Sequence, residues 1–276
     1  MIDTLYVNGC SWTEGYLLQE EQAVIDHAKN LGYEFINQYE IKKDGEFVEY
    51  HSLNFYNNFN WAGLVAKELN IPKIINHAVG AASNNRIVRT TINYVRNMTE
   101  QEKKETLVII GWTIADRSEL YLDDKHGTED WYRFHASNPF KDTLTRPHLN
   151  ENFVERIAKL HQQYVVDVHT DYYCVQNFLQ QSYLLATLLE YHGINYYFFN
   201  SFPVDWRYPD SDAVIYRFQT EILDYIKLNA MNPFDNFFTF IEHKPRFHLS
   251  DGHPNINGYK VWAEHILKDM QSKRIV

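Results

Sequence analysis

The chain has 276 residues, of which 45% are hydrophobic and 22% are charged. These values are typical of a packed globular protein and exclude a disordered chain, a collagen-like repeat and a coiled coil. Aspartate and glutamate number 36 against 26 lysines and arginines, which gives a formal charge of −10. Because this charge repels a polyanion such as DNA, we expect no nucleic-acid partner.

The cysteine content and the apolar stretches bear on the compartment. Cys10 and Cys174 are the only cysteines, too few for a disulfide framework, so a reducing compartment fits at least as well as an oxidising one. No basic region precedes Gly9, and we therefore expect no signal peptide. The apolar stretches are shorter than the roughly 18 to 20 residues that span a bilayer. We expect a cytoplasmic protein that does not bind membranes.

Short apolar runs alternate with helical patterns along the chain. The runs predict buried strands over 2–7, 73–78, 106–110 and 194–200. Between them, helices are predicted over 61–69, 84–98 and 178–191, the last ending at Gly193 as a C-terminal cap requires. This alternation predicts an α/β fold, a three-layer α/β/α sandwich around a central parallel sheet of flavodoxin-like type, with ligands at the carboxyl ends of the strands.

Two segments depart from the alternation. Residues 33–60 carry Asp44-Gly45, a hairpin signal, and predict a two-stranded excursion. Residues 123–149 are rich in aromatic residues and proline without periodicity, and we interpret them as a lid. Further helices are predicted over 151–168, 172–191, 215–228 and 256–270. The simplest organisation is one domain over 1–276 with insertions at about 33–60 and 123–149.

A serine follows the first predicted strand directly. In Asn8-Gly9-Cys10-Ser11-Trp12-Thr13-Glu14-Gly15, the Ser11 hydroxyl would lie at the carboxyl end of a central strand, where a nucleophile is well placed. Ser11 and Glu14 also match the S-x-x-E capping box that opens a helix. Both interpretations stay open, because amides at a helix start stabilise negative charge as readily as they accept a cap.

A second candidate lies near the end of the chain. Ser250-Asp251-Gly252-His253-Pro254-Asn255 precedes an amphipathic helix. As a structural element this is a turn in which Asn255 caps the helix. As a catalytic site, His253 would supply the base, Asp251 the carboxylate that orients it, and Ser11 the nucleophile of serine hydrolysis.

With these residues, the sequence resembles the SGNH hydrolases, or GDSL-like esterases. The family block Gly-Asp-Ser-x-x-x-Gly is similar to Gly9–Gly15, with Cys10 in place of the aspartate. The second block resembles 76–83, where the family offers a backbone amide to the oxyanion; Gly80 and Ala81 are the two possible positions here. The closing Asp and His resemble Asp251 and His253. The resemblance implies the SGNH fold and a carboxylic ester hydrolase without a cofactor.

The third block departs from the family. The family pattern Gly-x-Asn-Asp corresponds to Gly111-Trp112-Thr113-Ile114, so the Asn that donates to the oxyanion is missing. Thr113 takes its place with a single hydroxyl, and Asn84 or Asn85 could also reach the site. Loss of one oxyanion donor costs roughly 2.7 to 4 kcal/mol of transition-state stabilisation. A substitute donor is therefore expected.

Other side chains are candidates for substrate contact or metal binding. Trp12 and Trp112 flank the site, and Arg117 at the start of an expected helix could meet an anionic substrate or form a solvated ion pair. In the closing block, Ser250 rather than Asp251 stands at the family's usual spacing. The 13 histidines form no metal-ligand motif, so we expect no metal.

These observations favour a serine esterase. Ser11 would attack an ester, His253 would take its proton, and Asp251 would orient His253. The oxyanion would lie on the Ser11 amide, on the Gly80 or Ala81 amide, and on Thr113 or an Asn. Aromatic residues in the lid, Trp131, Tyr132 and Phe134, favour a small-molecule or glycan ester such as an O-acetylated glycan. The alternative is a catalytically silent SGNH-fold binding or structural module, for instance in a virus particle, because the variant blocks also resemble phage-encoded SGNH-like proteins.

Overall fold

The structure is a computed structural model of the chain. It describes residues 1–15, 18, 21–36, 41–48, 54–123, 129–134, 151–168, 170–204, 224–225, 229–232, 235–244, 247–249 and 251–276. Most of the expected helix over 215–228, most of the candidate lid and Ser250 lie outside these ranges.

A four-stranded parallel sheet forms the centre of the molecule. Its strands are β1 (Thr4–Asn8), β5 (Lys73–Asn76), β6 (Thr106–Trp112) and β9 (Asn195–Asn200), in the order β5-β1-β6-β9. Leu5 of β1 lies opposite Ile74 of β5 and Leu107 of β6. Every residue of β1 and β6 is buried, which explains their continuous apolar runs. The four strands predicted from the sequence are confirmed, each within a few residues.

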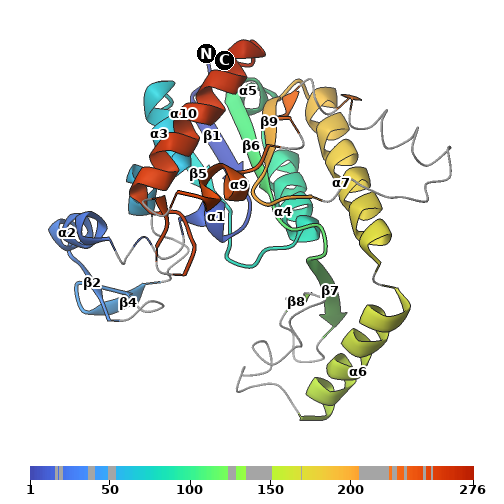
Figure 1. Ribbon diagram of the computed structural model, residues 1–276. Coiled ribbons are helices and arrows are strands. Elements are labelled where there is room, and N and C mark those ends of the chain that lie inside the picture. Colours follow the sequence, from blue (N-terminus) through green and yellow to red (C-terminus); the bar gives the residue numbers. More distant parts are fainter. Residues whose placement is uncertain are drawn as a thin grey trace.

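Helices cover both faces of this sheet (Figure 1). On one face, α3 (Trp61–Glu68) packs against α10 (Ile256–Ser272), and on the other, α4 (Asn84–Arg96) packs against α7 (Asp171–Tyr191). One core of buried apolar side chains joins the layers. The α/β/α sandwich predicted from the sequence is therefore confirmed. Within the described ranges, every helix is too short or too polar to cross a lipid bilayer.

Both expected insertions contain strands. After α2 (Gln22–Asn30), strands β2 (Tyr33–Phe35), β3 (Ile41–Lys43) and β4 (Glu46–Val48) form an antiparallel sheet, one strand more than expected. Asp44 and Gly45 connect β3 to β4 with φ of 53° and 88°, the left-handed values of a tight hairpin. Strand β7 (Ser118–Asp123) ends where the second expected insertion begins and pairs with β8 (Glu129–Phe134) inside it, and α6 (Glu151–Asp167) follows.

Some elements correct or extend the sequence analysis. Arg117 does not begin a helix, because the chain turns at Asp116 and enters strand β7 at Ser118. The four-residue helix α1 (Ser11–Glu14) follows β1, as the Ser11 pattern indicated. The structure also contains the one-turn helix η3 (Asn54–Asn58) and the short helices α5 (Glu100–Glu105) and α9 (Phe237–Glu242), which the sequence analysis did not predict.

Candidate active site

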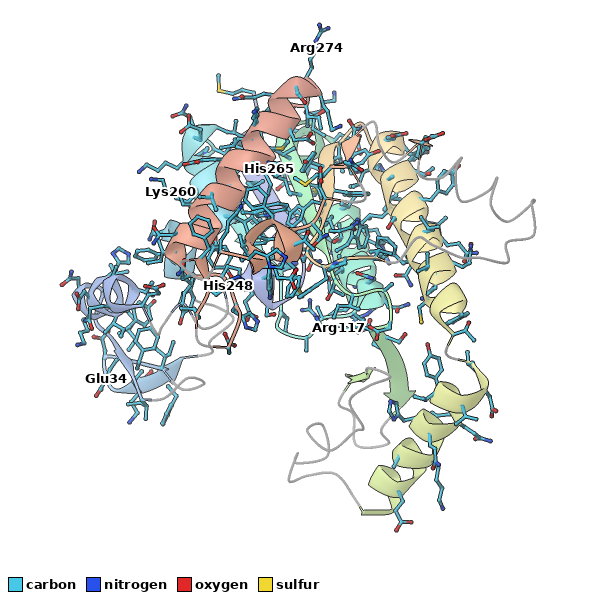
Figure 2. The ribbon with its side chains drawn as sticks, in the orientation of Figure 1. Glu34, Arg117, His248, Lys260, His265 and Arg274 are labelled. Atoms are coloured by element: carbon cyan, nitrogen blue, oxygen red, sulfur yellow. The ribbon has the colours of Figure 1, made fainter. Side chains whose placement is uncertain are left out.

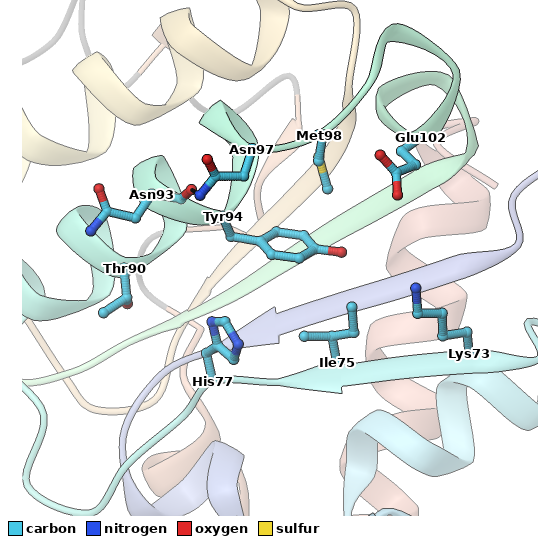
Figure 3. A pocket seen from close by; sticks show the side chains of 9 residues that line it. All are labelled: Lys73, Ile75, His77, Thr90, Asn93, Tyr94, Asn97, Met98 and Glu102. Carbon is cyan, nitrogen blue, oxygen red and sulfur yellow. Dashed lines mark hydrogen bonds between the residues drawn. The ribbon is translucent and has the colours of Figure 1, made fainter.

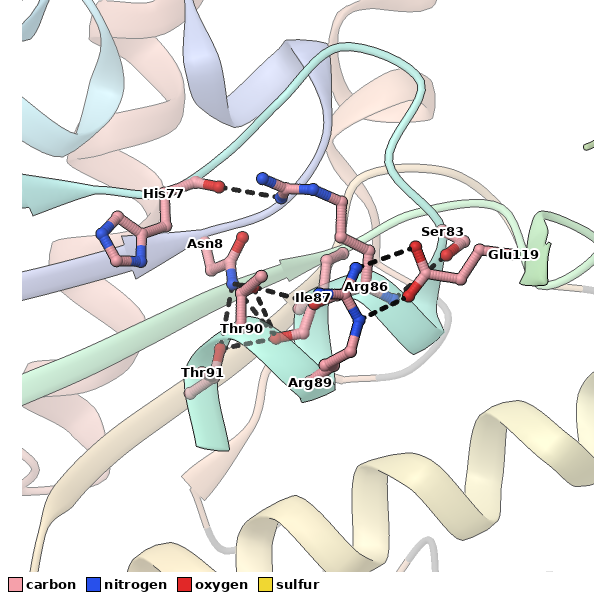
Figure 4. Close-up of polar contacts among 9 residues, drawn as sticks. All are labelled: Asn8, His77, Ser83, Arg86, Ile87, Arg89, Thr90, Thr91 and Glu119. Atoms are coloured by element: carbon pink, nitrogen blue, oxygen red, sulfur yellow. Dashed lines mark hydrogen bonds and ion pairs between the residues drawn. The ribbon is translucent and has the colours of Figure 1, made fainter. Parts of the chain in front are cut away.

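The carboxyl end of β1 is fixed against helix α4. The Asn8 side-chain nitrogen lies 3.1 Å from the Ile87 carbonyl oxygen, 2.7 Å from Thr90 Oγ1 and 3.0 Å from Thr91 Oγ1 (Figure 4). Its side-chain oxygen accepts the Gly9 N–H at 2.9 Å. Buried hydrogen bonds of this kind hold the residues that follow β1 in one position.

Close backbone packing places α1 directly after the strand. A Cβ on Gly9 would lie 2.3 Å from Thr13 Oγ1 and 2.8 Å from the Gly111 carbonyl oxygen. A Cβ on Gly111 would lie 2.6 Å from the same Thr13 oxygen. Only glycine fits at either position, and helix α1 is thereby pressed against the ends of both β1 and β6.

Ser11 is the first residue of α1, and it does not cap the helix. The cap position is Cys10, which contributes no side-chain hydrogen bond. Ser11 Oγ lies instead 2.9 Å from His253 Nε2, and the Glu14 carboxylate accepts the Gly80 N–H rather than the Ser11 N–H. The capping box considered for Ser11 and Glu14 is therefore wrong, because both side chains bond to distant parts of the chain.

His253 and Asp251 lie in one turn before α10. Asp251 Oδ1 accepts the His253 N–H at 3.0 Å, and Asp251 Oδ2 lies 2.7 Å from His253 Nδ1. Gly252 adopts a φ of 89°, which brings the two side chains to the same side of the turn. The predicted partner of His253 is thus Asp251; Ser250 lies outside the described residues.

Polar contacts on both sides fix this turn. His248 Nδ1 lies 2.9 Å from the Gly252 carbonyl oxygen, and Nε2 lies 2.8 Å from that of Ile241 in α9. Asn255 accepts the Gly258 N–H at 2.9 Å and caps α10, as its position indicated. His248 and Arg117 both lie toward the end of the sheet that carries α1 (Figure 2). The sequence analysis missed His248; its position just before the turn was the available signal.

Ser11, His253 and Asp251 form one connected arrangement, which we call the triad. Ser11 Oγ, His253 Nε2, His253 Nδ1 and Asp251 Oδ2 are joined by contacts of 2.9 Å and 2.7 Å, although Ser11 and His253 are 242 positions apart. A hydroxyl in this position can lose its proton to the imidazole as it attacks, and the carboxylate fixes which imidazole nitrogen carries hydrogen. The geometry is therefore suited to nucleophilic catalysis.

The segment after β5 lies beside Ser11. A Cβ on Gly80 would lie 3.9 Å from Ser11 Cβ and 3.3 Å from Glu14 Oε2. The Gly80 N–H donates to this carboxylate oxygen at 2.6 Å. Ala81 has a φ of 57°, a strained left-handed value for a residue with a side chain. Of the two candidate oxyanion amides, that of Gly80 is thus engaged by Glu14. This contact of Glu14 was not predicted from the sequence, where its side chain matched only the capping pattern.

Asn84 and Thr113 join the second and third blocks. Asn84 Oδ1 accepts the Thr113 N–H at 3.0 Å, and Asn84 Nδ2 donates to the Thr113 carbonyl oxygen at 3.3 Å. Asn84 is 2% exposed and Thr113 is 1% exposed. The Asn84 amide, considered as an oxyanion donor, is thus occupied by the backbone of Thr113.

Arg117 contacts Thr113 and an aromatic cluster. Its Nη1 donates to Thr113 Oγ1 at 2.7 Å, and its guanidinium lies 5.6 Å from the Phe202 ring centre. The ring centres of Phe202 and Trp12 are 5.0 Å apart, and those of Trp12 and His253 are 6.2 Å apart. Arg117, expected as a substrate contact or a solvated ion pair, therefore donates a hydrogen bond to the third block.

The two tryptophans have different positions. Trp12 is 3% exposed and packs against Phe202, Phe237 and Phe238 beside His253. Trp112 is 2% exposed and packs edge-on against Phe178 and Phe198. Trp112 was expected to contact substrate, but its ring belongs to the core because β6 is covered on both faces. The side chains of Trp131, Tyr132 and Phe134, which belong to the candidate lid, lie outside the described part of the structure.

Other polar features are not part of the triad. A groove of about 380 Å³ between β5 and α4 is lined by residues that include Lys73, His77 and Tyr94 (Figure 3). Burial, together with the nearby Arg86 charge, lowers the pKa of His77. Cys10 and Cys174 are both free and buried. Among the described residues, no group of three or more His, Cys, Asp or Glu side chains is placed to hold a metal ion.

Comparison with protein families gives one match that covers most of the chain. A family model described as "Family of unknown function (DUF6071)" matches residues 42–271. The chain belongs to this family. The matched region includes Asp251 and His253 and begins after Ser11. A search of curated proteins finds no match to the sequence.

Solved structures with a related arrangement include esterases. A psychrotrophic esterase, EstA from Pseudoalteromonas sp., is 10% identical with a TM-score of 0.46, over 98% of this chain and 97% of that one. A lipolytic protein of the G-D-S-L family from Desulfitobacterium hafniense is 12% identical with a TM-score of 0.43, over 99% of both chains. A carbohydrate esterase is 12% identical with a TM-score of 0.42, over 97% of this chain and 68% of that one.

Proposed function

We propose that the protein is a serine esterase in which Ser11 is the nucleophile, His253 the general base and Asp251 the orienting carboxylate. The observation that carries the proposal is the unbroken chain of contacts from Ser11 Oγ through His253 to Asp251. Because the capping role of Ser11 is absent, the hydroxyl has no structural hydrogen bond to the start of its own helix.

The reaction follows from these positions. Ser11 Oγ attacks the ester carbonyl carbon and passes its proton to His253 Nε2, which then gives it to the leaving alcohol oxygen. Water next attacks the acyl-enzyme, His253 takes the water proton, and the acid leaves as Ser11 recovers its hydrogen. Asp251 stabilises the imidazolium in both halves.

Three groups would receive the negative charge of the tetrahedral intermediate. They are the Ser11 amide at the start of α1, the Ala81 amide and the Thr113 hydroxyl. Ala81 is favoured over Gly80 because the Gly80 N–H already donates to Glu14. Thr113 is favoured over Asn84 because the Asn84 side chain is engaged by the Thr113 backbone.

The substrate proposed for this site is a small acyl ester, such as an O-acetyl group on a glycan. The half-buried Phe202, packed against Trp12 near His253, would supply an apolar surface that suits a short acyl chain. Arg117 adds a positive charge at the same surface.

Turnover of an activated acetyl ester tests the proposal. Purified wild-type protein should hydrolyse p-nitrophenyl acetate and release acetate from O-acetylated glycans, and Ser11→Ala should lose both activities. The melting temperature of Ser11→Ala should stay close to that of the wild type, because Ser11 caps no helix. A wild type that binds glycans or a protein partner without hydrolysing any ester would favour the silent binding module instead.

A further inference from the structure

We infer that Arg117 is a positioning residue that turns Thr113 into an oriented hydrogen-bond donor for the oxyanion. This inference rests on the proposed function. Its basis is the contact of 2.7 Å between Arg117 Nη1 and Thr113 Oγ1. Arg117 and Thr113 together then stabilise the oxyanion, as the Asn that is missing here does in the resembled family.

The sheet register places Thr113 close to the nucleophile. Asn8 of β1 lies opposite Ile110 of the parallel strand β6. Ser11 and Thr113 each follow their paired position by the same number of residues, so both emerge at the same edge of the sheet. Thr13 packs between Gly9 and Gly111, which brings α1 against the end of β6.

The backbone of Thr113 has little freedom. Asn84, the first residue of α4, bonds to both its N–H and its carbonyl oxygen. The residue is 1% exposed. The main freedom left to Thr113 is therefore the direction of its hydroxyl hydrogen.

Arg117 restricts the direction of the Thr113 hydroxyl hydrogen. A guanidinium has only donors, so Thr113 Oγ1 must be the acceptor in this contact, and its own hydrogen stays available. No described residue accepts that hydrogen. A hydroxyl that accepts from a cation is also a stronger donor, because charge-assisted bonds polarise the groups they join.

The rest of the side chain is held by its neighbours. The Arg117 N–H donates to the Ile114 carbonyl oxygen at 3.3 Å, and this turn folds the side chain back over Thr113. The guanidinium rests over Phe202, which contacts Trp12 beside His253. The guanidinium of this half-buried residue is thus held against Thr113 and Phe202.

A double-mutant cycle on a neutral ester tests the inference. With p-nitrophenyl acetate, Arg117→Met and Thr113→Val should each lower kcat about tenfold to a hundredfold with little change in KM. The double variant should be no slower than the worse single variant, because both changes remove the same donor. Arg117→Lys and Thr113→Ser should each recover most of the rate.

A matched control tests whether loss of a positive charge elsewhere on the protein also lowers the rate. Arg96 is exposed in the last turn of α4, about 18 Å along the helix from Asn84. Arg96→Met removes the same charge and should leave kcat and KM unchanged. Melting curves identify any variant that loses its fold. If Arg117→Met or Thr113→Val does so, the rates of Arg117→Lys and Thr113→Ser are compared with the wild type instead.

Three results would overturn the inference. One is an unchanged kcat for Arg117→Met on the neutral ester. Another is an additive loss in the double variant. The third is a rise in KM confined to anionic esters, which would make Arg117 a substrate-binding group. A wild type without turnover refutes the proposed function and this inference together, whereas an active wild type without coupling refutes the inference alone.

Discussion

Ser11 and His253 meet in the site, yet the fold holds them by different means. Ser11 is 8% exposed and sits on a helix pressed between the ends of two buried strands. The side chains of His253 and Asp251 are 20% and 37% exposed, and hydrogen bonds from His248 and Asn255 fix their turn. The nucleophile is therefore positioned by packing, and the base is positioned by polar contacts that solvent can reach.

This difference separates stability from activity. Changes at the glycines that pack α1 against the strand ends should alter the free energy of unfolding together with the rate. Changes to the polar side chains of the turn around His253 should alter the rate with little change in the free energy of unfolding.

Asp251→Asn should lower kcat about a hundredfold or more, because an amide no longer fixes the hydrogen on His253 Nδ1. Unfolding should change little, since Asp251 is partly exposed. Steady-state kinetics and a urea titration check both parts. A kcat equal to that of the wild type would remove Asp251 from the mechanism.

Gly9→Ala should destabilise the protein by about 1–3 kcal/mol and lower kcat as well. The added Cβ would fall 2.3 Å from Thr13 Oγ1 and 2.8 Å from the Gly111 carbonyl oxygen, so the backbone before Ser11 must move. Chemical denaturation and turnover should therefore change together. Loss of stability with normal kcat would show that α1 is not positioned by this packing.

Gly252→Ala should cost about 1–2 kcal/mol of stability, the usual penalty for a side chain at positive φ. Gly45→Ala is its matched control, because the two glycines have φ of 89° and 88° and no atom within 4 Å of an added Cβ. Both variants should lose similar stability, but only Gly252→Ala should lower kcat. Equal kcat in the two variants would contradict the role of the turn.

Glu14→Gln should have the smallest effect, a loss of about 1 kcal/mol or less. Its amide oxygen can still accept the Gly80 N–H, whereas the charge of the bond is lost. Thermal melts of the wild type and Glu14→Gln measure the difference. A loss as large as that of Gly9→Ala would mean that the Glu14 charge, and not packing, holds the nucleophile side.

Much of the fold could be predicted because its strands are buried on both faces. A strand of that kind reads as a short apolar run, and runs ending at Gly9 and Gly111 located β1 and β6. The Asp44-Gly45 hairpin was also predicted, since its backbone needs left-handed residues. Strand β7 was mistaken for a helix, because a two-stranded hairpin outside the main sheet has no comparable apolar run.

The site was predicted in part, and its errors share one cause. Ser11 could be named because it directly follows a buried strand, and Asp251 and His253 because they share one turn before a helix and match the closing block of the resembled family. The partner of Glu14 is 66 positions away at Gly80, and the partner of Asn84 is 29 positions away at Thr113. Contacts of that range depend on how the layers pack, so local patterns assigned Glu14 to a cap and Asn84 to the oxyanion.

Covalent labelling by a fluorophosphonate, read by intact and peptide mass spectrometry, tests the central claim most directly. Such a reagent forms a stable bond only with an activated serine whose developing charge is stabilised. The account predicts an adduct on Ser11 in the wild type, no adduct in Ser11→Ala and much slower labelling in His253→Ala. An unlabelled wild type, or labelling that persists in Ser11→Ala, would contradict it.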